Sequence, residues 1–346
     1  MAAIGVPVNL LAIIILPRGK CGLSTCTTRY LVAMAVADLL VIVIEVILSQ
    51  IKYHYFPLSF LDITPVCAVL PVIHVLRRIT TNCSVWFTVT FTFDRFVAIC
   101  CQKLKTKYCT GKTAAVVQIT TGLLLCLKNI PFYFATEPGK IIDNLPWFCG
   151  PKPSYFTDKG WLGLDWFDTV LTPLLPFAII LLLNALTVRH ILVASRVRRG
   201  LRGQSKRENS RDPEMENRKR SVILLFTLSG SFILLWLTVV VEFVYYQVKG
   251  TGEASIGSEN VLAQVGYVLA NVSCCTNTFI YAVTQSKFRE QVDGLRNSSA
   301  PTCLHSARSN FASDPNFSRN TFRTPACGAC MKVIDGNYRK ARSSGL

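Results

Sequence analysis

Asp94-Arg95-Phe96 closes one long apolar run of this chain, and Asn277-Thr278-Phe279-Ile280-Tyr281 closes the last one. An arginine at the end of a segment long enough to cross lipid is costly unless it faces a protein interior or a water-filled cavity. We therefore interpret Arg95 as a functional residue. The chain has seven apolar runs. The run that ends at the Arg95 motif is the third, and the run that ends at the Asn277 motif is the seventh.

The composition predicts a membrane protein. Of 346 residues, 51% are hydrophobic and the mean hydropathy is +0.38, which is too apolar for an ordinary soluble domain. Most of the apolar runs exceed the roughly 20 residues that cross about 30 Å of hydrocarbon. The runs lie at 2–16, 30–51, 66–100, 114–134, 169–193, 221–246 and 261–283. We expect an all-α membrane protein with a seven-transmembrane helix bundle over residues 1–284.

The first run is shorter than the others. Its fifteen residues, at about 1.5 Å of rise each, reach only about 22 Å. Met1 lies at its start, and the run has neither a basic flank nor a small-residue cleavage site, so it does not resemble a signal peptide. The expectation is a truncated first helix, with the natural start of the protein upstream of Met1.

The net charge of +17 gathers in alternate loops. Loop 189–220 carries eleven Lys or Arg against four acids, whereas the loops of the other side together hold five lysines against eight acids. By the positive-inside rule, loops 17–29, 101–113 and 189–220 and the tail are cytoplasmic. The charge thus indicates topology, and no nucleic-acid partner is expected. Loop 189–220 is a solvated linker near anionic lipid, a contact surface for a cytosolic partner, or both.

The chain has fourteen cysteines, but their pattern is not that of a disulfide scaffold. By topology only Cys67 and Cys149 lie on the oxidising side of the membrane. A bridge between them would pin the long second extracellular loop to the third helix. We expect that disulfide.

The last part of the chain predicts two further segments. Residues 285–296 repeat apolar positions at Phe288, Val292 and Leu295, a spacing that suits a short amphipathic helix on the membrane surface. Residues 297–346 have scattered Ser, Asn, Arg and Pro without periodicity, which predicts a disordered cytoplasmic tail.

Asp38 stands inside the second apolar run. A carboxylate buried in lipid needs a cation or hydrogen-bond donors. Ser84 lies eleven residues before Arg95 and on the same helix face, which makes it a plausible partner. The polar side chains of Ser273 and Asn277 in run seven, and of Asn9 in run one, add further ligands. The alternatives are an ion site and a polar network that joins helices without an ion.

These motifs together resemble those of the rhodopsin-like (class A) G-protein-coupled receptors. The resemblance covers about residues 5–296. Cys83-Ser84-Val85-Trp86, Asp94-Arg95-Phe96 and Leu183-Asn184-Ala185 look most like the orphan branch that senses aromatic amino acids. The resemblance implies a multi-pass plasma-membrane receptor that transduces an extracellular small-molecule or peptide signal to a heterotrimeric G protein, of the Gq class. Its partners would be that G protein, the ligand and membrane lipids.

The resemblance also implies roles for individual residues. Asp38, Ser84, Ser273 and Asn277 would form a sodium site that collapses on activation, so a structural sodium ion is the one cofactor considered. Arg95 would be held by Asp94 at rest and released toward the G protein. The implied switch residues are Asp94, Arg95, Phe96, Asn277, Tyr281 and Asn184. Phe232 and Trp236 would form the aromatic toggle, with plain core packing as the alternative.

The chain departs from the family pattern at several places. Thr238 and Thr278 stand where prolines are usual, and Asn184 replaces a common tyrosine. The acid that some members carry on helix six is absent, and Arg218 stands eighteen residues before Trp236. Arg95 would meet repulsion there, so the hypothesis is a weakly locked resting state with high basal signalling.

Charged residues also occur at the depth of the family's ligand pocket. Arg77 precedes Arg95 by eighteen residues, five turns, on the same face. The predicted pocket residues are Arg77, Arg78, Glu45, Asp168, Trp236, Val239, Glu242 and Phe243. Cations, carboxylates and aromatic rings together would suit a small zwitterion with an aromatic group. The alternative is that these charges only pair with one another and hydrate the cavity.

Other function classes have less support. Hydrolase and metalloprotease motifs are missing from the sequence, as is a pair of intramembrane histidines, so we expect no enzyme. A transporter would show inverted repeats or paired broken helices, which we do not find. A non-signalling, truncated receptor copy remains an alternative, because helix one is short.

Overall fold

A computed structural model describes residues 1–18, 21–48, 64–142, 145–202, 213–249 and 261–299. The helices are α1 (Ala2–Ile15), α2 (Thr25–Val41), α3 (Thr64–Cys100), α4 (Gln102–Tyr108), α5 (Gly111–Asn129), α6 (Pro153–Thr157), α7 (Lys159–Thr169), α8 (Leu175–Arg202), α9 (Pro213–Lys249), α10 (Val261–Thr284) and α11 (Ser286–Ser299). Two strands, β1 (Thr136–Ile142) and β2 (Leu145–Pro151), complete the elements that the rest of the text uses. Most of the predicted tail, 300–346, lies outside these residues.

Helix starts and interruptions follow local chemistry. Ser24 accepts the backbone N–H of Thr27 at 3.2 Å and so caps α2, and Thr110 accepts that of Thr113 at 3.2 Å at the start of α5. π-helical turns at Ile42–Leu48 and Val170–Leu174 extend α2 and join α7 to α8.

Four helical stretches of the described chain are long and apolar enough to cross a membrane. They are Pro71–Cys100, Gly111–Ala135, Lys159–Arg196 and Ser221–Glu242, and they coincide with the third to sixth predicted runs. The first run forms the shorter apolar helix Ala2–Arg18. α2 and α10 occupy the second and seventh runs.

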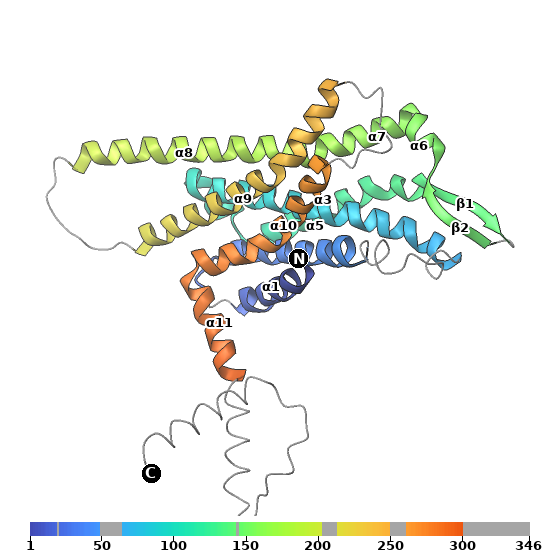
Figure 1. Cartoon of the computed structure of the whole chain (residues 1–346). Helices are drawn as coiled ribbons and strands as arrows, with labels where there is room; N and C mark the ends of the chain where they lie inside the picture. The colour runs from blue at the N-terminus through green and yellow to red at the C-terminus, as the bar shows by residue number, and fades with distance from the viewer. Residues whose placement is uncertain (19–20, 49–63, 143–144, 203–212, 250–260, 300–346) are drawn as a thin grey trace, which may run out of the picture. The chain divides into compact units, whose positions relative to one another are not determined.

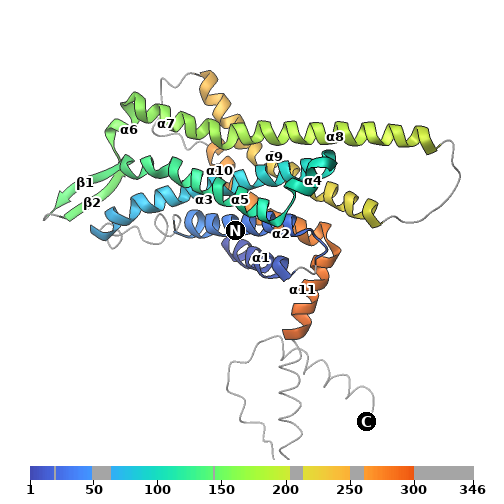
Figure 2. The same ribbon diagram turned by 180° about the vertical axis from the view of Figure 1, so that it is seen from behind.

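The compact unit spans Met1–Arg289, and the rest of α11 belongs to a second unit. Within the first unit α3 is central, since it contacts α2, α5, α8 and α9 (Figures 1 and 2). α1 packs closely on its neighbours at Gly5, where an added Cβ would lie 2.5 Å from Ile42 Cδ1 and 2.6 Å from Cys275 Sγ. A side chain at position 5 would therefore push α1 away from the bundle.

The second extracellular loop of the sequence prediction contains an antiparallel hairpin that the periodicity did not indicate. β1 pairs with β2 from Thr136 opposite Pro151 to Ile142 opposite Leu145. β2 contacts α3 (Figure 1). The side chains of Cys67 and Cys149 lie outside the described ones, so the predicted disulfide stays a prediction.

α11 occupies most of the stretch predicted as a membrane-surface helix. Its Phe288 is buried and packs edge-to-face on the Tyr281 ring, 6.4 Å between centroids. Phe288, the first apolar residue of the predicted amphipathic face, therefore packs against α10. Contact of α11 with lipid stays a prediction.

Candidate functional site

Arg95 is buried at one end of the bundle, which we call the Arg95 end. Its Nε donates to Asp94 Oδ2 at 3.0 Å, and its Nη2 forms an ion pair with the same oxygen. On its other side Nη1 donates to Ser221 Oγ of α9 at 3.3 Å. Asp94 is fully buried. α3 and α9 are thus joined here by a neutral hydroxyl.

Two cysteines complete the surroundings of Asp94, and sequence reasoning missed both. The Cys26 thiol of α2 donates to Asp94 Oδ1 at 3.0 Å, and Cys109 Sγ lies 3.7 Å from the Asp94 carbonyl oxygen. Burial, followed by the charge of Asp94, raises the pKa of Cys109 to about 12. Its thiol therefore stays protonated at neutral pH and remains a donor.

A cavity of about 530 Å³ opens beside Arg95. Its lining includes Arg95, Ser221, Gln102, Lys105, Cys109 and Gln285. The helix-six residue that meets Arg95 is Ser221, three positions beyond the Arg218 of the sequence prediction. The Arg218 side chain lies outside the described ones, so the predicted repulsion is not placed.

Asp38 is fully buried in the middle of the bundle. Ser84 Oγ donates to its Oδ1 at 2.5 Å, and Asn277 Nδ2 donates to its Oδ2 at 2.7 Å. The Cys274 side chain lies close to this carboxylate, a neighbour the sequence did not suggest. In the part of the chain that the structure describes, no lysine or arginine pairs with Asp38. A carboxylate and a hydroxyl oxygen without a resident cation suit a small hard cation such as sodium.

Two other predicted members of this site lie differently. Ser273 is buried one turn before Asn277, but its side chain makes no hydrogen bond to Asp38 in the part of the chain that the structure describes. Asn9 does not reach Asp38. It donates to the Cys274 carbonyl at 2.9 Å and lies 3.3 Å from the Thr278 hydroxyl. Asn9 therefore ties α1 to α10 beside the carboxylate.

The remaining switch residues join neighbouring helices. Asn184 Nδ2 of α8 donates to Ser229 Oγ of α9 at 2.8 Å. Tyr281 is fully buried against Phe288. Phe96, next to Arg95, is half-buried.

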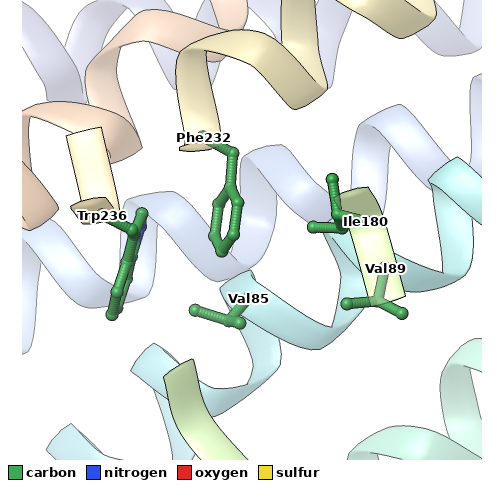
Figure 3. Packing of buried hydrophobic residues seen from close by; sticks show 5 residues of the cluster. All are labelled: Val85, Val89, Ile180, Phe232 and Trp236. Carbon is green, nitrogen blue, oxygen red and sulfur yellow. The ribbon is translucent and has the colours of Figure 1, made fainter. Parts of the chain in front are cut away.

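Phe232 and Trp236 stack in the core with 5.6 Å between ring centroids and 25° between planes. Figure 3 shows Val85 of α3 near both rings of α9, with Ile180 of α8 and Val89 of α3 on the Phe232 side. These five residues form one buried cluster. A turn of either ring would change contacts among three helices at once.

A second cavity, of about 420 Å³, lies next to Trp236, and we call it the Trp236 pocket. It is lined by Val41, Glu45, Thr81, Ser84, Trp236, Val239, Glu242, Tyr267, Ala270, Asn271 and Cys274. Four predicted pocket residues are among them: Glu45, Trp236, Val239 and Glu242. Ser84 and Cys274 belong also to the Asp38 network, so the pocket and that network share a wall.

Of the other predicted pocket residues, Arg77, Arg78 and Asp168 do not line the Trp236 pocket. Arg77 donates to Glu45 Oε1 at 3.0 Å with its side chain 40% exposed. Arg78 and Asp168 pair with each other at 2.6 Å. The charges are thus divided into separate groups because each arginine has its own acid. Phe243 lies outside the described side chains.

We call the Arg78 group the outer cluster. Arg78 also contacts Asp165 and the Tyr155 hydroxyl, both at 3.2 Å, and lies 4.0 Å from the centroid of the Phe132 ring. Lys128 of α5 pairs with Asp168, and Asn82 donates to the same carboxylate at 3.3 Å. The outer cluster therefore joins α3, α5, α6 and α7.

Comparison with known proteins agrees with this architecture. The model of the family "7 transmembrane receptor (rhodopsin family)" matches residues 8–281. The chain is 25% identical over 296 residues to neuropeptide receptor 22 of Caenorhabditis elegans, covering 82% of this chain and 64% of that receptor. It is 22% identical over 307 residues to the FMRFamide receptor of Drosophila melanogaster, covering 84% of this chain and 51% of that receptor.

A third relative is cysteinyl leukotriene receptor 1 of Sus scrofa, 20% identical over 229 residues, with 64% of this chain and 62% of the relative covered. The chain thus spans between about half and two thirds of the length of these relatives. The family consists of receptors, which are not enzymes. The family match covers most of the chain and accounts for the all-α fold and the apolar helices. The chain belongs to the rhodopsin family of seven-transmembrane receptors.

Proposed function

We propose that this chain is a G-protein-coupled receptor that binds a small extracellular ligand carrying an ammonium group and an aromatic ring. An aromatic amino acid is the simplest ligand of this kind, and the partner is a heterotrimeric G protein of the Gq class. The observation that carries the proposal is the Trp236 pocket, which places two glutamates beside Trp236.

Glu45 supports the ammonium half of the ligand. Its side chain is only 6% exposed, and Arg77 contacts one carboxylate oxygen. The other oxygen, Oε2, is buried without a hydrogen-bond partner. A buried carboxylate oxygen without a donor is costly, so a donor group on a ligand would be favoured there. Arg77, half-exposed beside it, would be available to the ligand's carboxylate.

Trp236 supports transmission of the signal. It lines the pocket and belongs to the buried cluster with Phe232, Val85, Val89 and Ile180. A ligand that displaces its ring would repack α3, α8 and α9. The same movement would strain the α9 end of the hydrogen bond between Ser221 and Arg95.

The membrane arrangement follows from the charge of the loops. We infer a plasma-membrane protein with the Arg95 end and the tail 297–346 in the cytoplasm, and with the hairpin outside. Residues 1–284 would form the bundle and 285–296 a helix on the membrane surface, as the sequence predicts. The sodium site at Asp38 and the disulfide between Cys67 and Cys149 belong to the same proposal.

The names of two relatives favour a second ligand class. They are receptors for neuropeptide and FMRFamide. A short peptide with an aromatic residue at its amino terminus presents the same ammonium and ring to Glu45 and Trp236. The pocket chemistry is therefore shared, and ligand length is what separates the two.

To test the proposed function, the chain is expressed in cells with and without a grafted extracellular segment, and surface display and calcium release are measured. Tryptophan, phenylalanine and short aromatic peptides are added in turn. Glu45→Gln and Glu242→Gln should each weaken the response about tenfold, the cost of losing one charged hydrogen bond. Glu137→Gln, in the hairpin strand β1, is the matched control and should change nothing.

The remaining outcomes decide among the alternatives. Surface display without a response to any of these ligands would reject the aromatic-ammonium ligand. Display without basal or ligand-driven nucleotide exchange on any G protein would favour the non-signalling copy. Flux of a ligand across the membrane would favour a transporter.

A further inference from the structure

Ser221 is the contact of Arg95 on α9. Its hydroxyl oxygen lies 3.3 Å from Arg95 Nη1, and its half-buried side chain lines the cavity at the Arg95 end. The arginine's other partner, Asp94, is its neighbour on the same helix and cannot hold α9. Among the described residues, no acid on α9 pairs with Arg95. The link between α3 and α9 at this point is a hydrogen bond to a neutral group.

The sequence before Ser221 adds an independent observation. Arg218-Lys219-Arg220 places three consecutive basic residues immediately before the hydroxyl. Protein kinases choose substrates partly by such charge patterns, and an acidic substrate groove selects basic residues on the amino-terminal side of the acceptor. Lys219 is exposed. Ser221 lies eight residues from the start of α9 at Pro213, so a kinase would need only the first turns of this helix to open locally.

We propose that Ser221 is phosphorylated by a basophilic protein kinase and that phosphoserine 221 locks α9 to Arg95. In the transfer, Ser221 Oγ forms a bond to the γ-phosphorus of ATP. The bond between that phosphorus and the bridging oxygen breaks, ADP leaves, and the hydroxyl proton passes to the kinase base. The product supplies the acidic partner on helix six that this sequence lacks.

The geometry suits the product. A phosphoserine carries about −1.5 to −2 charges at neutral pH with three acceptor oxygens, and arginine pairs with such a group through two parallel hydrogen bonds. Lys105 and Gln102 line the same cavity of about 530 Å³, which has room for the phosphate and offers further donors. Cys26 holds the other Asp94 oxygen, so Asp94 stays partnered when Arg95 is shared.

The inference rests on the proposed coupling to a G protein for its effect on signalling, but not for the lock itself. The experiment therefore has a readout without G protein. Full-length receptor in lipid nanodiscs is treated with the catalytic subunit of an arginine-directed kinase and ATP, and the modified residues are identified by mass spectrometry. Fluorescent noncanonical amino acids at the exposed positions Leu104 of α4 and Ile223 of α9 report the separation of the two elements.

We expect phosphate on Ser221 and none on Ser195, a half-buried serine of α8 whose hydroxyl donates to the Leu192 carbonyl of its own helix. Phosphorylation should shift the measured distances between the labels at Leu104 and Ile223 to shorter values and narrow their spread. Arg95→Gln should abolish that change. Basal nucleotide exchange should fall about fivefold, at the low end of ordinary two-state couplings. Ser221→Ala should prevent both changes, and Ser195→Glu should reproduce neither.

An unmodified Ser221 in receptor whose loop serines are phosphorylated would overturn the proposal. So would a phosphorylated Ser221 with an unchanged distance distribution, or one whose effect persists in Arg95→Gln. A narrowed distribution in a receptor that never stimulates nucleotide exchange would support the lock and reject the proposed coupling instead.

Discussion

Arg78, which is half-buried, and Arg95, which is buried, are two arginines of the same helix, and they are held in different ways. Arg78 has its partners on other elements: Asp168 at 2.6 Å, Asp165 and Tyr155 at 3.2 Å, and the Phe132 ring. Arg95 has an ion pair with its own neighbour Asp94 and one hydrogen bond to another helix.

The number of partners on other elements indicates that Arg78 is fixed in place and that Arg95 can move. Moving Arg78 would break several contacts between elements at the same time, each in a partly dry environment where charges interact strongly. Moving Arg95 would break one hydrogen bond between helices, while its charge stays paired with Asp94. A receptor needs a rigid outer frame and an inner end with two arrangements of similar energy. The positions of the partners, more than the burial of the arginines, distinguish the two ends.

The substitution with the largest expected effect on stability is Arg78→Met. Methionine keeps the length of the side chain and removes the charge, which leaves Asp165 with Tyr155 and Asp168 with Lys128 and Asn82. We expect a loss of about 2 kcal/mol of stability, below the range for a fully buried pair, because Arg78 is partly exposed and Asp168 keeps Lys128. The measurement is thermal unfolding of purified receptor, together with surface display.

Arg77→Gln is the matched control for that variant. Arg77 is the preceding residue of the same helix, is 40% exposed and has one acidic partner. Its loss should cost about 1 kcal/mol, less than the loss of Arg78, since the Arg77 side chain is partly exposed and the glutamine amide can still donate a hydrogen bond to the buried Glu45. Equal destabilisation by the two variants would show that the number of partners does not set the rigidity of the outer frame.

Asp94→Asn tests the movable arginine. The amide keeps the shape of the side chain but removes the charge that holds Arg95 in place. We expect basal nucleotide exchange to rise about fivefold, an effect typical of a shifted two-state equilibrium, and thermal stability to fall, because the buried Arg95 loses its charged partner. Basal exchange at or below the unmodified level, at matched surface display, would mean that Asp94 does not restrain Arg95.

Asp38 extends the comparison to a buried acid without a basic partner among the described residues. If sodium supplies the missing cation, replacing N-methylglucamine by sodium should stabilise the receptor. The gain should be about 1 kcal/mol at a sodium concentration about five times the dissociation constant. Asp38→Asn should abolish the gain. A sodium effect of equal size in the variant would leave Asp38 as part of a helix-joining network alone.

How far these arrangements follow from the sequence depends on the kind of contact. Apolar run lengths and the Asp94-Arg95-Phe96 motif predicted the all-α fold and the family, because lipid imposes the span length and the arginine needs a protected end. Helical phase placed Ser84 on the Arg95 face of α3, where it meets Asp38. Such predictions need only the geometry of one helix.

Contacts set by the rotation and spacing of neighbouring helices could not be predicted in this way. Cys26 and Cys109 read as ordinary apolar positions, yet they meet Asp94 from α2 and from the turn before α5. Arg77 and Arg78 differ by one residue and turn to different partners on α2's extension and on α7. The β1–β2 hairpin was missed because Pro, Gly and charged residues interrupt the alternation that marks a strand.

The finest test of the outer cluster is the hydroxyl of Tyr155, which lies outside the membrane-spanning helices. It donates to Asp165 at 2.8 Å and accepts from Arg78. Burial, followed by the hydrogen bond to Asp165, raises the pKa of Tyr155 from 10.0 to about 12. Because the folded state holds the proton more tightly, this contribution to stability is complete below pH 10 and is lost as the pH rises through 12.

Tyr155→Phe should therefore lower the melting temperature slightly at pH 8 and flatten its decline above pH 10. The loss at pH 8 should be about 1 kcal/mol or less, because one half-buried hydrogen bond is removed while Arg78 keeps both acids. Melting curves of the two proteins from pH 8 to 11 provide the measurement. Parallel declines in the two proteins would mean that the hydroxyl does not titrate within the cluster. Arg78 would then be held in place by Asp165 and Asp168 alone. The difference in how firmly Arg78 and Arg95 are held would come from these two acids of α7.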